Sequence, residues 1–172
     1  MQVRRINLPK KLQKLCNGIL ATDGKESTDI LWFPDLKQPL LGRSYICNIT
    51  DCYEMVRSYY YQTYGITLMA IPREWDFWEH EPNLVLDKYR EAGFKEVLID
   101  DMEVGDLVVL RLPMDYINHL GVYIGDDKII HHLHDRLSVE DSVPRWRSRI
   151  VKVLRYNASK RNKSTKKVTK TL

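Results

Sequence analysis

The most informative run in this chain is His119-Leu120-Gly121-Val122-Tyr123-Ile124-Gly125-Asp126-Asp127. Leu120, Val122 and Ile124 alternate with the residues between them, so the two sets lie on opposite faces of a strand. The glycine and two aspartates that follow predict a hairpin turn, and Lys128–Leu133 is then the returning strand. The same pattern predicts strands at three further ranges: Phe94–Ile99, Leu107–Leu110 and Ile150–Leu154.

Helical patterns come earlier in the chain. Residues 51–64 form the clearest predicted helix, because Asp51 can cap it, Glu54 completes a capping-box pattern and Gly65 follows its end. Helices that precede a consecutive run of antiparallel strands are typical of the α+β class. Three other ranges also carry predictions: helical spacing in residues 12–20, two helical pieces in residues 72–92 and an irregular lead-in at residues 32–43.

The chain has 172 residues, which is enough for one domain of ordinary size. Its basic character belongs to one end. Residues 157–172 hold six of the 27 Lys and Arg residues and no acid, so the remainder has 21 basic and 23 acidic residues, a net charge of −2. This segment has almost nothing apolar to bury, so we expect a disordered tail. Such a tail could contact nucleic acid or an anionic surface. A tail that only aids solubility explains the composition equally well, so we do not expect a nucleic-acid partner.

Several classes of protein are not expected. No run approaches the roughly 20 apolar residues of a membrane-spanning helix. The N-terminal residues have no apolar core and no small-residue cleavage site, so no signal peptide is predicted. Three cysteines do not resemble a disulfide framework, and Cys47 and Cys52 are predicted to remain thiols. A structural zinc site is not expected either, because the chain has no CxxC pair.

Cys52 is the candidate nucleophile, because it stands in the first turn of the predicted helix. The unpaired N–H groups and the positive end of the helix dipole favour a thiolate there. The candidate base is His119, which opens a strand beside Gly121, where a ligand backbone would have room to approach. The simpler alternative is that Cys52 is a small buried hydrophobic residue and His119 a capped or solvent-facing one.

The residue that would orient His119 depends on the register of the hairpin. An odd-sized turn brings His131 to the face of His119, whereas an even-sized turn brings His132 or His134 there. Spacing alone does not choose between them. Another alternative is a transition-metal site made by these three histidines and Cys52, although their spacing is irregular.

Several motifs together resemble the NlpC-type, papain-like cysteine peptidases, which cut the peptide stems of bacterial cell-wall peptidoglycan. The similarity is greatest to the phage tail assembly proteins of lambda-like phages that carry such a domain, and it covers residues 38–156. The most specific motifs are Asp51-Cys52 at the start of a helix and the run from His119 to Asp126. Other matching segments are Pro39–Arg43, Thr50–Tyr53, Tyr64–Ile66, Glu74–Trp78, Ala92–Phe94, Gly105–Leu107, Asn118–His119, Ile130–His132 and Arg136–Ser138.

The resemblance implies a papain-like NlpC fold of the α+β class, with an antiparallel sheet packed against an N-terminal helix that carries the catalytic cysteine. It implies Cys52 as the nucleophile, His119 as the base and His131 as the orienting third residue. The resemblance also implies that the protein is a monomer and that its active site uses no metal and no cofactor. Asp51 and Gly121 are candidate substrate-binding residues beside this triad.

Two departures from the family pattern bear on catalysis. Tyr53-Glu54 follows the cysteine, where many members have Ser-Gly. Many members also carry a tyrosine ahead of the cysteine, and Pro39–Arg43 has none. Arg43 or Tyr45 could take its place, so Arg43 is a third candidate substrate-binding residue.

The expected partners are peptidoglycan stem peptides and other phage tail proteins. The expected location is the host cytoplasm during assembly and then the virion tail tip. The chief alternative is a tail assembly scaffold that keeps the peptidase fold with weak or no catalysis. Long tail proteins of this kind carry a metalloprotease-like domain first, for which residues 1–37 are too short. Residues 1–37 are thus an unassigned extension, and residues 157–172 a tail outside the peptidase domain.

Overall fold

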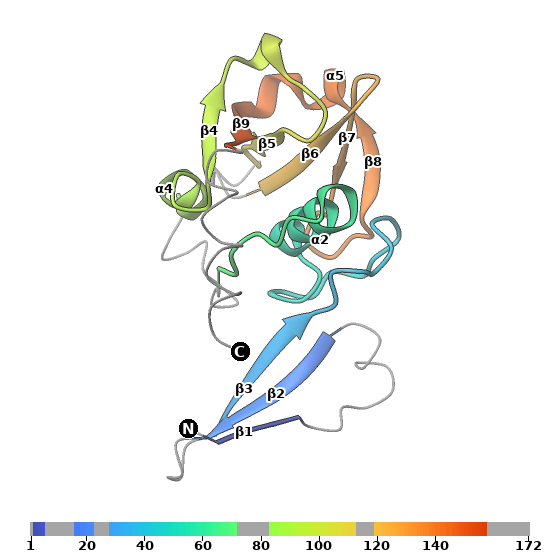
Figure 1. The fold of residues 1–172 in the computed structure, drawn as a ribbon. Coiled ribbons are helices and arrows are strands. Elements are labelled where there is room, and N and C mark those ends of the chain that lie inside the picture. The colour runs from blue at the N-terminus through green and yellow to red at the C-terminus, as the bar shows by residue number, and fades with distance from the viewer. Residues whose placement is uncertain (1, 6–15, 23–27, 72–82, 113–118, 158–172) are drawn as a thin grey trace. The chain divides into compact units, whose positions relative to one another are not determined.

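The computed structural model describes residues 2–5, 16–22, 28–71, 83–112 and 119–157 (Figure 1). The chain forms two compact units. The first comprises residues 1–76 and 130–140, and the second comprises residues 77–129 and 141–172. Five predictions lie outside the described residues: the helical spacing at 12–15, the helical piece at 72–82, the motif segment Glu74–Trp78, the motif residue Asn118 and the basic tail from residue 158.

The N-terminal part of the first unit is a three-stranded antiparallel sheet in the order β1-β2-β3. Its strands are β1 (Gln2–Arg5), β2 (Cys16–Thr22) and β3 (Thr28–Pro34). The prediction of helical spacing was therefore wrong for residues 16–20, and residues 32–34 are not irregular. The physical reason is pairing: all seven residues of β2 lie opposite residues of β3, which supplies backbone hydrogen bonds that apolar spacing does not reveal.

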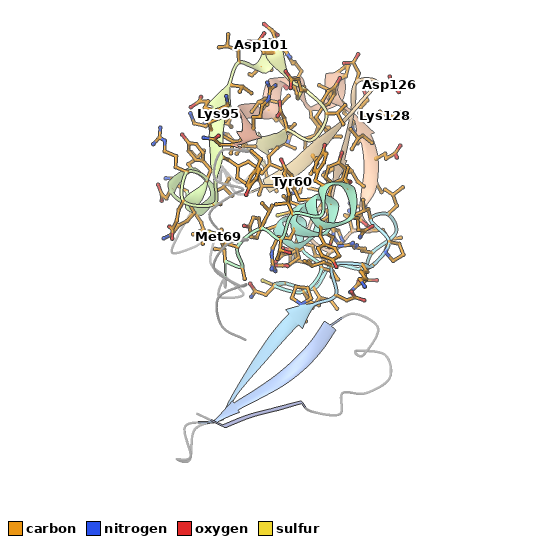
Figure 2. All side chains as sticks on the ribbon, viewed as in Figure 1. Tyr60, Met69, Lys95, Asp101, Asp126 and Lys128 are labelled. Carbon is orange, nitrogen blue, oxygen red and sulfur yellow. The ribbon has the colours of Figure 1, made fainter. Side chains whose placement is uncertain are left out.

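Helix α2 (Cys52–Tyr64) confirms the clearest prediction. It ends at Gly65, whose φ of 65° lies in the left-handed region, and Gly65 N–H donates to the Tyr61 carbonyl at 3.0 Å. Met55 and Val56 on this helix are fully buried. Figure 2 labels Tyr60, which is buried on the same helix. The helix thus presents an apolar side to the core and its first residue, Cys52, at the N-terminal end.

The second sheet has six antiparallel strands in the order β4-β9-β5-β6-β7-β8 (Figure 1). Its strands are β4 (Phe94–Val97), β5 (Leu107–Leu110), β6 (His119–Gly125), β7 (Lys128–His131), β8 (Val139–Ser142) and β9 (Ile150–Tyr156). Five of the six were predicted, and β8 was not. Together with α2 this sheet confirms the α+β class.

Within the second unit, β5 is the central strand of the described pairings. Leu110 lies opposite His119 on β6, and Leu107 lies opposite both Val122 on β6 and Leu154 on β9. All four residues of β5 are buried, as expected for a strand with neighbours on both sides. The pairing of β5 with β6 thus fixes the backbone of His119, which is the first residue of β6.

Short helical turns complete the second unit: α4 (Leu84–Lys88), η1 (Ile99–Asp101), α5 (Val143–Trp146) and η2 (Arg147–Arg149). Of the two helical pieces predicted in residues 72–92, the described residues 83–92 contain one α-helix, the five residues of α4. The predicted strand at 94–99 ends at Val97, because the chain turns into η1. No helix in the described part of the chain has both the length and the apolar character needed to cross a membrane.

Candidate active site

Asp51 caps helix α2 and so fixes the backbone on which Cys52 stands. Its Oδ1 accepts hydrogen bonds from the N–H groups of Tyr53 and Glu54, both at 3.0 Å, and its Oδ2 accepts one from Asn48 N–H at 2.6 Å. The Asp51 side chain is buried, and the predicted N-cap is confirmed. Glu54 pairs with Arg57 at 2.7 Å within the helix. The role that this geometry supports for Asp51 is capping, and its contact with substrate stays a prediction.

Cys52 is the first residue of α2 and is partly exposed. The turn that leads into it is held by Thr50, whose hydroxyl donates to the Ser44 carbonyl at 2.6 Å and whose N–H donates to the Ile46 carbonyl at 2.8 Å. Cys47 lies in the same turn, and no disulfide joins it to Cys52, as predicted. The Cys52 side chain is therefore a thiol at the start of a helix, the position that favours a thiolate.

Arg43 is buried and committed to the protein interior. Its guanidinium donates to the carbonyls of Pro39 and Gln38, the latter at 2.7 Å, and to Ser58 Oγ at 3.1 Å. Burial lowers the pKa of Arg43 to about 10, against the opposing effect of the Asp35 and Glu54 carboxylates. These contacts support an anchoring role for Arg43, and its contact with substrate stays a prediction.

His131 and His132 are both buried in the first unit. The Nε2 atom of His132 lies 3.0 Å from the Arg136 carbonyl, which can only accept, so this nitrogen is the donor. Burial lowers the pKa of His132, while the carbonyls of Arg136 and Thr50 oppose that effect. The Thr50 carbonyl makes no hydrogen bond of ordinary geometry with Nδ1. His132 is thus a neutral imidazole beside the turn that leads into α2.

Tyr45 joins this group through its ring. It makes edge contacts with His132, at 5.3 Å between ring centroids, and with His134, at 4.8 Å. His134 is exposed and lies 3.2 Å from the Asp135 carboxylate. Tyr45 therefore contacts two of the histidines that the sequence left as alternatives. The charge of Arg43 also acts on His132, so which of Tyr45 and Arg43 takes the place of the missing tyrosine stays a prediction.

His119 and Gly121 belong to the second unit. The His119 side chain is 3 % exposed, and its ring centroid lies 6.5 Å from that of Trp146. Gly121 is buried opposite Val108 on β5. The register places His119 and Gly121 on one face of β6, with Leu120 and Val122 on the other, as predicted.

The hairpin after β6 bears on the third residue. Two residues, Asp126 and Asp127, separate β6 from β7, and both have positive φ, which is typical of a type I′ turn (Figure 2 labels Asp126 and Lys128). An even-sized turn alone would bring His132 or His134 to the face of His119. Gly125 also has a positive φ of 91°, the conformation of a bulge glycine, and a bulge would shift the register by one. The role of His131 stays a prediction.

The structure therefore groups the predicted residues by unit. Cys52, Asp51, Arg43 and His131 belong to the first unit, whereas His119 and Gly121 belong to the second. The approach of the His119 imidazole to the Cys52 sulfur stays a prediction. Within the described ranges, no three His, Cys, Asp or Glu side chains are arranged to hold a metal ion.

Comparison with known proteins gives one family. A model of the NlpC/P60 family matches residues 41–155. The chain is 34 % identical over 134 residues to a tail tip assembly protein K of Escherichia phage N15, covering 75 % of this chain and 54 % of that protein. It is 30 % identical over 120 residues to the protein of the same name in Escherichia phage lambda, covering 69 % and 60 %. The matched region spans a little over half the length of these relatives.

Proposed function

Because this chain belongs to the NlpC/P60 family, we propose that it is a cysteine endopeptidase of a phage tail that hydrolyses the peptide stems of peptidoglycan. The observation that carries the proposal is the position of Cys52 as the first residue of a capped helix. The family match and the two tail tip relatives support the peptidase fold and the association with a phage tail.

In the proposed reaction His119 takes the proton of Cys52, and the thiolate attacks a carbonyl carbon of the stem peptide to form a C–S bond. His119 then protonates the departing amine as the C–N bond breaks. Water, deprotonated by His119, attacks the thioester, which releases the carboxylate and restores the thiol. His131 would hold the His119 ring in its working tautomer.

The start of α2 narrows the choice of oxyanion donors. The N–H groups of Tyr53 and Glu54 already donate to Asp51, so they are committed to the cap. The backbone N–H of Cys52 itself precedes them and is the donor that we propose for the oxyanion. One such donor contributes roughly 3 kcal/mol to the transition state.

The test is digestion of purified sacculi, with mass analysis of the released fragments. We expect wild-type protein to release stem-peptide fragments and Cys52→Ala to release none. Cys47→Ala is the matched control, because Cys47 lies in the turn just before α2 and has no role in the proposed reaction. Equal release by wild type and Cys52→Ala would contradict the proposal, and so would no release by the wild type from any wall type.

A second candidate is a tail assembly scaffold that keeps the peptidase fold. The observation that favours it is the residue pair after the cysteine: Tyr53 and Glu54 are both buried, Tyr53 donates through its hydroxyl to the Met69 carbonyl at 2.9 Å, and Glu54 pairs with Arg57. Both side chains thus serve the fold. In either case we propose other tail proteins as partners, with assembly in the host cytoplasm followed by a place at the tail tip.

A further inference from the structure

The second unit holds an aromatic contact on the proposed base that the proposed mechanism does not use. The ring centroids of His119 and Trp146 are 6.5 Å apart, with 43° between the ring planes. Both side chains are buried. The separation lies within the range over which aromatic rings interact, so Trp146 is a packing neighbour of the imidazole.

The indole of Trp146 is itself held in place. Its Nε1–H donates to Asp141 Oδ2 at 2.9 Å. Asp141 is fixed in turn, because its carboxylate accepts from Ser142 N–H at 2.9 Å and from the Arg145 guanidinium at 3.1 Å. The guanidinium of Arg149 lies over the indole ring, 5.8 Å from its centroid. These contacts restrict the two side-chain torsions of Trp146.

The segment that carries Trp146 is anchored at both ends. At its start, Val143 N–H donates to the Asp127 carbonyl at 2.7 Å, and Asp127 lies in the turn after β6. At its end, Arg111 N–H donates to the Arg149 carbonyl at 2.9 Å. Arg111 follows Leu110, which is the cross-strand partner of His119. The segment 143–149 is thus tied to the regions at both ends of β6, and Trp146 lies beside its first residue.

We infer that Trp146, held by Asp141, is a positioning residue that fixes the ring orientation of His119. The inference rests on the proposed function, in which His119 is the base. A base acts efficiently only when its ring is held close to the productive geometry, and small misplacements are costly. The strand alone fixes the backbone of His119, whereas the indole limits the rotation of its side chain.

The experiment compares Trp146→Leu, which removes the ring, with Trp146→Phe, which keeps a ring without the Nε1–H donor. Asp141→Asn retains a carbonyl acceptor for the indole, and Asp141→Ala does not. The matched control is Phe94→Leu, because Phe94 is a buried aromatic residue of the same unit that does not contact His119 in the described interactions. It lies on the edge strand β4, at the other side of the sheet from β8, and its ring centroid is 5.3 Å from that of Tyr156. The first readout is the NMR spectrum of the His119 ring, assigned with His119→Gln.

We expect the indole ring current to shift the His119 ring protons in wild type and in Asp141→Asn, and that shift to disappear in Trp146→Leu. On stem peptides we expect Trp146→Leu to lower kcat about tenfold with KM nearly unchanged, and Trp146→Phe to recover only part of the loss, because a phenyl ring fills the space but cannot donate to Asp141. Phe94→Leu should lower the melting temperature to a similar extent without changing kcat. Unchanged His119 signals in Trp146→Leu, or a kcat equal to that of Phe94→Leu, would overturn the inference.

The two proposals fail separately. If wild-type protein does not hydrolyse stem peptides, the proposed function fails, and the NMR signature still decides whether Trp146 orients the His119 ring. If Cys52→Ala abolishes hydrolysis while Trp146→Leu retains it in full, the proposed function stands and the positioning role fails.

Discussion

The guanidinium of Arg155 binds both carboxylate oxygens of Asp106, with Nε 2.9 Å from Oδ1 and Nη2 2.8 Å from Oδ2. Asp106 is buried, and its Oδ2 also accepts from Glu103 N–H at 2.8 Å. The hydrogen bond to Asp106 raises the pKa of Arg155, so the arginine is charged at every accessible pH. This pair ties β9 to the turn that precedes β5, and thereby supports the strand that lies opposite His119.

The first prediction concerns this pair. Arg155→Met should lower the free energy of unfolding by about 2–4 kcal/mol, because it leaves a buried carboxylate without its partner. The control is Arg147→Met, since the Arg147–Asp100 pair is exposed on both sides and should contribute at most about 1 kcal/mol. Chemical denaturation of the two variants measures the difference. Equal losses would show that the burial of Asp106 has no energetic consequence.

The second prediction separates capping from substrate binding at Asp51. Asp51→Ala should cost about 1 kcal/mol of stability, because the N–H groups of Tyr53 and Glu54 lose their acceptor. Asp51→Asn keeps an acceptor oxygen and should retain most of that stability. If Asp51 acts only as a cap, KM for stem peptides is unchanged in Asp51→Asn. A large rise in KM with unchanged stability would instead assign Asp51 to substrate.

Local chemistry explains which elements could be predicted from the sequence. Helix α2 carries its own boundaries, because Asp51 caps one end and Gly65 adopts the left-handed conformation at the other. Strands β5 and β6 show long apolar or alternating patterns that only burial in a sheet explains. In contrast, β8 (Val139–Ser142) is a polar edge strand whose residues are mostly exposed, so it has no apolar pattern to detect.

The same distinction applies to the candidate site. The position of Cys52 at a helix start could be predicted, because the capping residue Asp51 directly precedes it; its role as nucleophile stays a prediction. The guanidinium of Arg43 donates hydrogen bonds to Ser58 Oγ and to two carbonyls. These bonds depend on how the chain folds back on itself, which the spacing of residues in the sequence does not reveal. The contact of Trp146 with His119 likewise depends on hydrogen bonds from Val143 to Asp127 and from Arg111 to Arg149, which are remote in sequence.

The third prediction concerns acid stability. Burial lowers the pKa of His132 below its value in the unfolded chain, about 6.5. The stabilising contribution of the neutral ring is therefore complete above that value and is lost as pH falls through the lowered pKa, because the unfolded chain binds the proton first. His132→Gln should flatten the dependence of unfolding free energy on pH in this window. His134→Gln is the control, because His134 is exposed; an equal flattening there would contradict the assignment.

The fourth prediction tests the anchoring role of Arg43. Arg43→Met should lower the free energy of unfolding by about 3 kcal/mol, because buried carbonyls and Ser58 lose a charged donor. Arg43→Lys should recover only part of this loss, since an ammonium does not reproduce the planar fork of the guanidinium. An anchoring role predicts that both variants change stability more than KM for stem peptides. A rise in KM in an Arg43→Lys variant that keeps its full stability would instead show that Arg43 binds substrate.

The fifth prediction distinguishes a peptidase from a scaffold by the reactivity of Cys52. A thiolate stabilised by a helix start and by an imidazolium reacts with iodoacetamide well below the ordinary thiol pKa of about 8.5. We therefore expect Cys52 to be alkylated at least about tenfold faster than Cys47 at pH 7, with the rate persisting towards lower pH. His119→Gln should move the pH midpoint of the Cys52 reaction upward, because the proton acceptor is lost, and should leave Cys47 unchanged. Mass analysis of peptides after timed quenching measures both sites in one sample. Equal rates at the two cysteines, or a midpoint that does not respond to His119→Gln, would favour the scaffold.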